Sequence, residues 1–253
     1  MNNPSHVLFA IFAALALCSC PQRAGAVDGV VVITQARAIA GGVTPGDEPG
    51  FPVTISQPGS YRLASNLHVT ASETGAIVLA ADHVEVDLNG FTIFGPGKDS
   101  GHSAGIGAEN YRGNYVVLRN GAVRSMGGDG VSLGWWVEVD EMSSMENGGN
   151  GIAITEGRVS RSRAIKNGRI GFLLYSTSQI TRSIASENGR AGIVHYGGLI
   201  SDSIIQGNME AGIESHGNVA YWSNRIDLNQ TGNVVGPSLE LGANICGRST
   251  ACQ

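Results

Sequence analysis

The sequence predicts an all-β solenoid, a parallel β-helix with coils of 20 or 21 residues. A glycine returns at this interval, at Gly130, Gly151, Gly171, Gly192, Gly212 and Gly232. An asparagine keeps the same interval, at Asn147, Asn167, Asn188, Asn208 and Asn229. The composition agrees, because 37 of 253 residues are glycine and only 6% are aromatic, as many short strands and turns require. A unit this short cannot bury a core alone, so successive units must stack.

Residues 180–193 represent one coil, in which short alternating strands are separated by turn residues. Each strand is expected to pair in parallel with its equivalent one coil away, at about 4.8 Å. The repeated asparagines then predict a ladder of turn amides along the axis, each hydrogen bond worth ~0.5–1.5 kcal/mol. A second polar column is predicted at Ser162, Ser183, Ser203 and Asn224. The alternative for both columns is a set of solvated loop residues.

Three columns of charged residues test this register, because equivalent positions on adjacent coils should touch. They are Glu146, Lys166 and Glu187; Arg169, Arg190 and Glu210; and Glu141, Arg161, Arg182 and Asp202. Each column offers an opposite-charge neighbour. The pairs Arg161–Arg182 and Arg169–Arg190 are predicted to be like-charged contacts.

Residues 1–26 are predicted to be a signal peptide, because the apolar run at 7–17 is too short to cross a bilayer as a helix. Two processing sites compete. Residues 24–26 (Ala-Gly-Ala) fit cleavage before Val27, which gives a soluble protein. Residues 17–20 resemble a lipobox, which would place a lipid on Cys20 and anchor the protein to a membrane. Either way we expect export to the periplasm or the cell exterior.

The rest of the chain, 27–253, is predicted to be a single β-helix domain. It comprises an N-terminal cap and first strands at 30–70, coils at 76–235 and a tail at 236–253. A short helix over 33–40, with Thr34 as N-cap, is expected to cover the first coil. Cys246 and Cys252 predict one disulfide that fixes the tail, with a pair of unlinked thiols as the alternative. Extra residues at 94–103 and 109–114 predict two loops that bulge from the coils.

Three segments carry a resemblance to a known family: residues 50–55 (GFPVTI), 58–63 (PGSYRL) and 86–93 (VDLNGFTI). They resemble exported bacterial right-handed parallel β-helix proteins of the pectate-lyase-like superfamily, over nearly all of the chain after the signal. The resemblance implies a right-handed helix. It also implies the superfamily's polysaccharide lyases, hydrolases and epimerases, among which many members have no assigned activity.

A column of residues four positions after each repeat glycine is the main candidate binding site. It contains Gly134, Thr155, Tyr175, Tyr196 and His216, with Trp135 and Trp136 beside it. Strand alternation places the column outside the helix. Exposed rings one coil apart predict a track for a polysaccharide, which is itself a repeating ligand. The alternative is that the rings stack on one another and shield the strand, at ~0.5–1.5 kcal/mol a pair.

A second hypothesis is a lyase, epimerase or hydrolase that uses the loop at 94–103, with Lys98, Asp99 and His102 as candidates. Hydrolysis requires two carboxylates ~5–9.5 Å apart. The candidate pairs are Glu138 with Asp140 and Glu156 with Glu214. We expect no cofactor or metal, except that calcium would suit a lyase if several carboxylates converged.

A third hypothesis is a structural or adhesive surface protein. Ala153, Leu173 and Val194 are predicted to form an outward apolar strip suited to self-association, and the oligomeric state is left open. His195 is expected to be a hydrogen-bonded core residue. The net charge of −5 without a basic stripe argues against nucleic acid as a partner.

Overall fold

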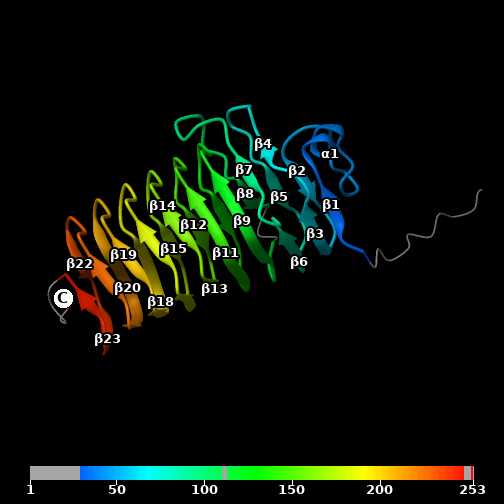
Figure 1. Cartoon of the computed structure of the whole chain (residues 1–253). Coiled ribbons are helices and arrows are strands. Elements are labelled where there is room, and N and C mark those ends of the chain that lie inside the picture. Colours follow the sequence, from blue (N-terminus) through cyan, green and yellow to red (C-terminus); the bar gives the residue numbers. More distant parts are fainter. Residues whose placement is uncertain (1–28, 110–112, 248–251, 253) are drawn as a thin grey trace, which may run out of the picture.

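In the computed structural model, which describes residues 29–109, 113–247 and 252, the chain winds into an elongated stack of coils (Figure 1). All strand pairs are parallel and join residues one coil apart, as Ile152 pairs with Phe172 and Phe172 with Ile193. The predicted parallel β-helix is confirmed. The predicted signal peptide, including Cys20, lies outside the described residues. Within the described ranges, no helix is both long and apolar enough to cross a membrane.

A complete coil contributes one short strand to each of three sheets, which surround a common core. The first sheet contains β2 (Val53–Ile55), β5 (Ile77–Leu79), β8 (Ile106–Ala108), β10 (Val131–Leu133), β12 (Ile152–Ile154), β15 (Phe172–Leu174), the first parts of β18 (Ile193–Ser201) and β20 (Ala211–Trp222), and β22 (Gly232–Val235). Its inward residues are the predicted apolar ones that follow the repeat glycines, including the fully buried Phe172.

The second and third sheets complete each coil. The second sheet contains β1 (Val31–Ile33), β3 (Gly59–Leu63), β6 (Val84–Asp87), the first parts of β9 (Val117–Arg124) and β11 (Val137–Met145), β13 (Gly157–Ser160), β16 (Ser178–Thr181), the second parts of β18 and β20, and β23 (Ser238–Gly242). The third sheet contains β4 (Leu67–His68), β7 (Thr92–Phe94), the second parts of β9 and β11, β14 (Arg163–Ile165), β17 (Ile184–Ser186), β19 (Ile204–Gln206), β21 (Arg225–Asp227) and β24 (Ile245–Cys246).

Three corners join these sheets. The first corner leads from the first to the second sheet, the second corner from the second to the third, and the third corner from the third to the next coil. The asparagine ladder occupies the third corner, where Nδ2 of Asn147 donates to Oδ1 of Asn167 at 2.9 Å and Nδ2 of Asn167 donates to Oδ1 of Asn188 at 3.1 Å. These side chains are buried, so the alternative of solvated loop residues is excluded.

The second predicted polar column lies at the second corner. The backbone N–H of Ser162 donates to Oγ of Ser183 at 3.2 Å, and the pattern continues through Ser203 to Asn224. Asn244 extends it by one further coil, because its Oδ1 accepts from the backbone N–H of Asn224 at 2.9 Å. Both predicted columns therefore satisfy backbone donors at turns, where the strand ladder cannot.

The repeat glycine is explained by close approach between coils. A Cβ atom placed on Gly171 would lie 2.5 Å from the carbonyl oxygen of Gly192 and 2.7 Å from Nδ2 of Asn188. Since every repeat glycine except Gly232 faces an asparagine of the ladder in this way, the two sequence repeats are parts of one packing arrangement. No side chain fits between the ladder and the start of the first sheet.

The charged columns lie at the outer surface of the corners, and the structure partly changes their pairing. Lys166 binds Glu187 at 3.6 Å and Arg190 binds Glu210 at 3.2 Å, as their register predicts. Arg161 binds Glu141, as predicted, and also Asp140, whereas Glu146 binds Arg124 of the preceding coil. The predicted contact of Arg161 with Arg182 is thereby offset by two carboxylates.

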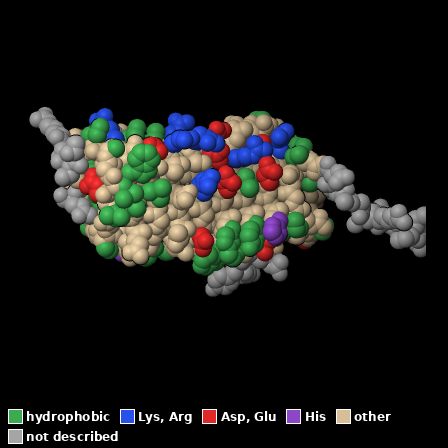
Figure 2. Space-filling view, turned by 90° about the horizontal axis from the view of Figure 1, so that it is seen from below, with side chains coloured by type: hydrophobic (Ala, Val, Ile, Leu, Met, Phe, Trp, Pro, Cys, Tyr) green, Lys and Arg blue, Asp and Glu red, His purple; other side chains and the backbone are tan. Residues whose placement is uncertain are grey.

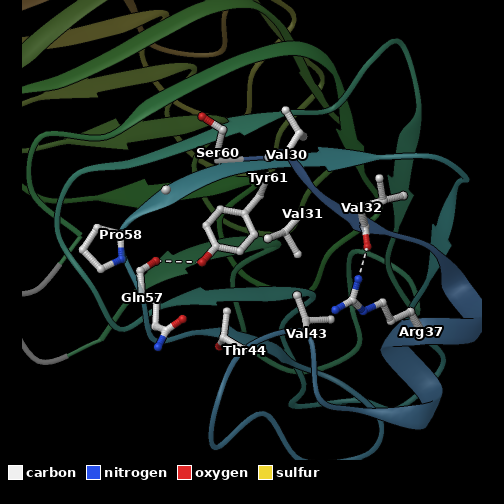
Figure 3. Close-up of a pocket in the computed structure, with 12 residues that line it drawn as sticks. Val30, Val31, Val32, Arg37, Val43, Thr44, Gln57, Pro58, Ser60 and Tyr61 are labelled. Atoms are coloured by element: carbon white, nitrogen blue, oxygen red, sulfur yellow. Dashed lines mark hydrogen bonds between the residues drawn. The ribbon is translucent and has the colours of Figure 1, made fainter. Parts of the chain in front are cut away.

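The N-terminal end carries the predicted helix, α1 (Gln35–Ala40) (Figure 1). Oγ1 of Thr34 accepts the backbone N–H of Arg37 at 3.1 Å, which confirms the N-cap. A hollow of about 420 Å³ lies between α1 and β3, where the Tyr61 hydroxyl donates to the Gln57 carbonyl at 2.8 Å and the Arg37 guanidinium to the Val32 carbonyl at 3.0 Å (Figure 3). Burial raises the pKa of Tyr61.

At the C-terminal end, Cys246 and Cys252 form the predicted disulfide, with 5.1 Å between their Cα atoms. Both cysteines are buried against the last coil. The strands β23 and β24 pair with β20 and β21, so the stack continues as far as Cys246. The disulfide therefore ties the described end of the chain to the third sheet.

Candidate functional site

Aromatic side chains gather at the first corner in two stacks. The N-terminal stack consists of His83, Tyr115 and Trp136, whose successive ring centroids are 4.7 and 4.8 Å apart with interplanar angles of 7° and 10°. Trp135 lies beside it, 6.1 Å from Trp136 and tilted by 43°. In all three cases the stacked ring directly precedes a buried valine that starts the second-sheet part of its coil. The inward valine fixes the backbone, which turns the preceding side chain outward.

The C-terminal stack consists of Tyr175, Tyr196 and His216, as the glycine spacing predicts. Tyr175 and Tyr196 lie 5.2 Å apart at 29°, and Tyr196 and His216 lie 4.8 Å apart at 20°. Glu214 holds the last ring, since its Oε1 lies 2.7 Å from Nε2 of His216. The outward position of this column is confirmed by its exposure, which is 44% for Tyr175.

Stacking limits the ring surface that a ligand can contact. A coil spacing of about 4.8 Å is close to the separation of stacked aromatic planes, so each inner ring has both faces covered by its neighbours. Tyr115 and Tyr196 therefore present only their edges. A continuous track of free ring faces does not form, and the shielding alternative describes the inner rings correctly.

One coil without an aromatic ring separates the two stacks. We call this place, formed by Thr155 and Glu156, the aromatic gap. The backbone N–H of Thr155 donates to Gly134 at 3.0 Å and that of Tyr175 to Ile154 at 3.1 Å, which places Thr155 between the coil of Trp136 and that of Tyr175. Two coil steps span about 10 Å. Trp136 and Tyr175 each stack on one side only, so their other faces are directed toward this gap.

Two surface hollows adjoin the first corner near the ends of the stacks. One, of about 290 Å³, is lined by His83, Tyr115, Glu85 and Ser60. The other, of about 550 Å³, follows His216 and is lined by residues that include Asn218, Ala220, Pro237 and Leu239. The first corner thus combines aromatic edges, two free ring faces and recesses on the second sheet.

Sequence reasoning missed His83 and Tyr115 as members of the aromatic corner. They do not follow a repeat glycine at the usual distance, because the loops upstream of Ile106 and after Glu109 interrupt the period. A different signal identifies them, namely an aromatic or histidine residue just before the valine of an inward-facing strand. His83–Val84, Tyr115–Val116 and Trp136–Val137 share it.

The loop at 94–103 begins at the end of β7 and crosses the third corner, away from the aromatic corner. Its backbone packs on glycines of the following coils, with Lys98 against Gly148 and His102 against Gly128. The side chains of Lys98, Asp99 and His102 are exposed. The carboxylate of Glu73 lies against this loop, where its Oε2 accepts the backbone N–H of His102 at 3.1 Å. The smaller predicted loop at 109–114 lies partly outside the described residues.

The structure separates one of the two candidate carboxylate pairs. Glu214 lies opposite Val194, which lies opposite Leu173 and then Ala153, so it is three coils, or about 14 Å, from the coil of Glu156. Glu138 and Asp140 share the outward face of β11, where Asp140 binds Arg161 and accepts from Oγ of Ser160 at 2.8 Å, whereas Glu138 has no such partner among the described residues. Among the described residues, no group of three or more His, Cys, Asp or Glu side chains is placed to hold a metal ion.

A band of charge runs along the second sheet (Figure 2). Asp87, almost fully buried, lies between Arg62 at 3.5 Å and Arg119 at 3.3 Å, and Arg119 also binds Glu85 at 2.7 Å. The hydrogen bond with Glu85 and the neighbouring carboxylates raise the pKa of Arg119 against the opposing effect of burial. These guanidinium groups are therefore already engaged within the protein.

His195 is buried as predicted, but the predicted hydrogen bonds are absent. Neither ring nitrogen has a hydrogen-bond partner within the part of the chain that the structure describes. The side chain lies in register with Leu174 and Ser215 on the inward side of the first sheet, among apolar residues. Burial lowers its pKa to about 4, so the imidazole is neutral near pH 7.

The predicted apolar strip is less exposed in the structure than the sequence suggested. Ala153, Leu173 and Val194 point away from the main core in adjacent coils, as expected. They pack with Ile170 and Ala191 into a small second cluster, however, and each is less than a tenth exposed. The strip therefore offers little apolar surface for contact with another molecule.

Comparison with known proteins agrees with this architecture. Residues 60–231 match the family model described as the right handed beta helix region, so the chain belongs to this family. A mutant of the periplasmic alginate epimerase AlgG superposes with a TM-score of 0.62 at 14% identity, over 79% of this chain and 56% of that one.

The enzymatically active domain of tailspike protein 2 from bacteriophage CBA120 superposes with a TM-score of 0.58 at 15% identity, over 78% of this chain and 37% of that one. This chain thus corresponds to little more than half of the epimerase structure and little more than a third of the tailspike domain. No curated protein sequence matches it. At these identities the likeness establishes the fold alone.

Proposed function

We propose that this protein binds a polysaccharide at the first corner and that one sugar ring sits in the aromatic gap. The observation that carries the proposal is the pair of ring faces, on Trp136 and Tyr175, that both stacks leave uncovered toward Thr155 and Glu156. Both rings are about half exposed, at 51% and 44%. Sugar rings present apolar C–H faces that pack on aromatic planes, and their hydroxyl groups can bond to Glu156.

The span of the gap supports a single inserted ring. About 10 Å separates the two coils that carry Trp136 and Tyr175. A ring held between two aromatic planes, at van der Waals contact with each, needs ~7–8 Å between those planes. Longer glycans would continue along the ring edges toward the hollows beside His83 and Pro237.

The fold is compatible with this proposal, since alginate epimerase and a phage tailspike domain are built on it. An exported location in the periplasm or outside the cell would give access to such polymers. We favour binding over turnover because the carboxylate that reaches the loop at 94–103, that of Glu73, is bound to the backbone N–H of His102.

The test is retention of the purified protein on a panel of neutral and acidic polysaccharides, with and without calcium, together with an assay for released sugars. We expect retention without products. Trp136→Ala and Tyr175→Ala should each weaken retention about five- to tenfold, because each removes one ring face.

Trp222→Ala is the matched control, since that exposed ring lies at the end of β20, away from the first corner. Its effect should be under about threefold. Unchanged retention in the Trp136→Ala, Tyr175→Ala double variant would contradict the proposed site. Released unsaturated or shortened sugars would instead make the protein an enzyme.

A further inference from the structure

The charges around the aromatic gap restrict the kind of glycan it can accept. Glu156 is half-buried and lies in register with Trp136 at the gap, and Glu138 lies exposed on the second sheet two residues after Trp136. Within the described residues, neither carboxylate has a hydrogen-bond or ion-pair partner. Both are therefore available to a ligand, and both carry negative charge into the site.

Positive charge near the gap is limited. Arg158 is exposed and lies opposite Glu138 in the sheet register, so the nearest guanidinium already faces a carboxylate. Arg119, one coil from Glu138 in the other direction, is held by Glu85 and Asp87. Within the described residues Arg158, like Glu138, makes no ion pair, so the gap has one guanidinium against the two carboxylates of Glu138 and Glu156 and a net negative charge.

The ends of the aromatic corner repeat this pattern. Glu85 lines the hollow beside His83 and Tyr115, and neither that hollow nor the one beside His216 has Lys or Arg in its lining. Glu214 accompanies His216 at the end of the C-terminal stack. A ligand that follows the corner therefore meets acidic side chains at both ends and at the gap.

We propose that the glycan bound at the aromatic corner carries no acidic groups, and is a neutral or amino-substituted polysaccharide; this rests on the proposed function. Free carboxylates accept hydrogen bonds from hydroxyl or ammonium groups. They repel the carboxylates of a polyuronate, and like charges placed together are an effective means of rejecting a wrong ligand.

Binding constants should be compared for soluble cellulose derivatives, galactomannan, chitosan oligosaccharides, alginate and polygalacturonate, at low salt and at high salt. We expect a neutral or amino glycan to bind at least about tenfold more tightly than either polyuronate at low salt. Affinity for a neutral glycan should change less than about twofold with salt, because no charge pair forms.

The Glu138→Gln, Glu156→Gln double variant separates the electrostatic from the aromatic contribution. Its affinity for polyuronates should rise about threefold or more, while its affinity for a neutral glycan stays within about threefold. Arg190→Gln, at a charge of the third corner, is the matched control and should leave the preference unchanged.

If a polyuronate binds as tightly as the neutral glycans do, and its binding depends on Tyr175, this inference is overturned but the proposed function stands. Binding of no glycan at all would overturn the proposed function itself, and this inference with it. If only chitosan oligosaccharides bind, with affinity lost in the double variant, the amino-substituted class is identified.

Discussion

Asn167 and Asn188 are joined twice, since both the backbone N–H and Nδ2 of Asn167 donate to Oδ1 of Asn188 at 3.1 Å. Nδ2 of Asn167 also donates to the Ser144 carbonyl at 3.1 Å, so the amide connects three successive coils. One side chain thus replaces the strand pairing that is lost at the third corner. The same arrangement repeats along the ladder and sets the stacking of the coils.

Asn167→Ala is therefore expected to destabilise the fold by about 3 kcal/mol, because it leaves buried donors and acceptors of Asn147, Asn188 and Ser144 unpaired. Chemical denaturation, followed by circular dichroism, measures the loss. Gln179→Ala, which removes an exposed outward amide from the second sheet, should change stability by less than ~0.5 kcal/mol. Equal losses in the two variants would show that the ladder carries no special stability.

Gly171→Ala tests whether close packing explains the glycine repeat. Its Cβ would meet the Gly192 carbonyl and the Asn188 amide, neither of which can move without breaking the ladder, so we expect a loss of several kcal/mol. At Gly107, also on the first sheet, the nearest atom to a new Cβ is 3.7 Å away. Gly107→Ala should be neutral or slightly stabilising, and a similar melting temperature for both variants would refute the explanation.

The sequence predicted the ladders well because they depend only on the period. Residues such as Asn167 and Asn188 meet in any stack of coils in which the repeat is regular. Tyr175, Tyr196 and His216 were found by the same reasoning. His83 and Tyr115 were not, since loops displace them from the repeat, although their inward strands remain in register.

The sequence could not predict which faces of the aromatic rings stay uncovered. Ring orientation depends on side-chain rotamers and on the neighbouring side chain in the next coil, and the spacing of the sequence repeat gives no information about either. The second partner of Arg161, Asp140, was missed for a similar reason, whereas Glu141 was predicted. A long side chain can reach Asp140 diagonally as well as the residue directly opposite, and the better charge pair wins.

Asp87→Ala is expected to cost about 2–3 kcal/mol. The carboxylate is nearly buried and accepts from the backbone N–H of Asn89 at 2.7 Å and from Nδ2 of Asn120 at 3.3 Å, so its loss leaves two partly buried hydrogen bonds unmade. The ion pairs with Arg62 and Arg119 add less, because both guanidinium groups are exposed. Glu210→Ala, which breaks the exposed pair with Arg190, should cost under ~0.5 kcal/mol and serves as the control in urea denaturation.

The lowered pKa of His195 leads to a prediction of how the free energy of unfolding depends on pH. Its pKa is about 4 in the folded protein and about 6.5 in the unfolded chain, so protons bind the unfolded state more strongly. Above pH 6.5 the imidazole is neutral in both the folded and the unfolded state, so it does not change the free energy of unfolding. As the pH drops from 6.5 toward 4, the unfolded chain is protonated first, and the free energy of unfolding falls by about 3 kcal/mol in total. Carboxylates also titrate toward the lower end of this range, so the comparison must be made between variants.

His195→Leu places an apolar side chain in line with Leu174 and removes two buried nitrogens that have no partner in the described structure. Unfolding free energies measured by urea denaturation between pH 7.5 and 4.5 should therefore fall less steeply in this variant than in the wild type. At pH 7.5 the variant should be at least as stable, because the unpaired polar atoms are gone. His102→Ala, at an exposed loop position, should follow the wild-type curve. Parallel curves for wild type and His195→Leu would mean that the buried imidazole is not the source of acid sensitivity.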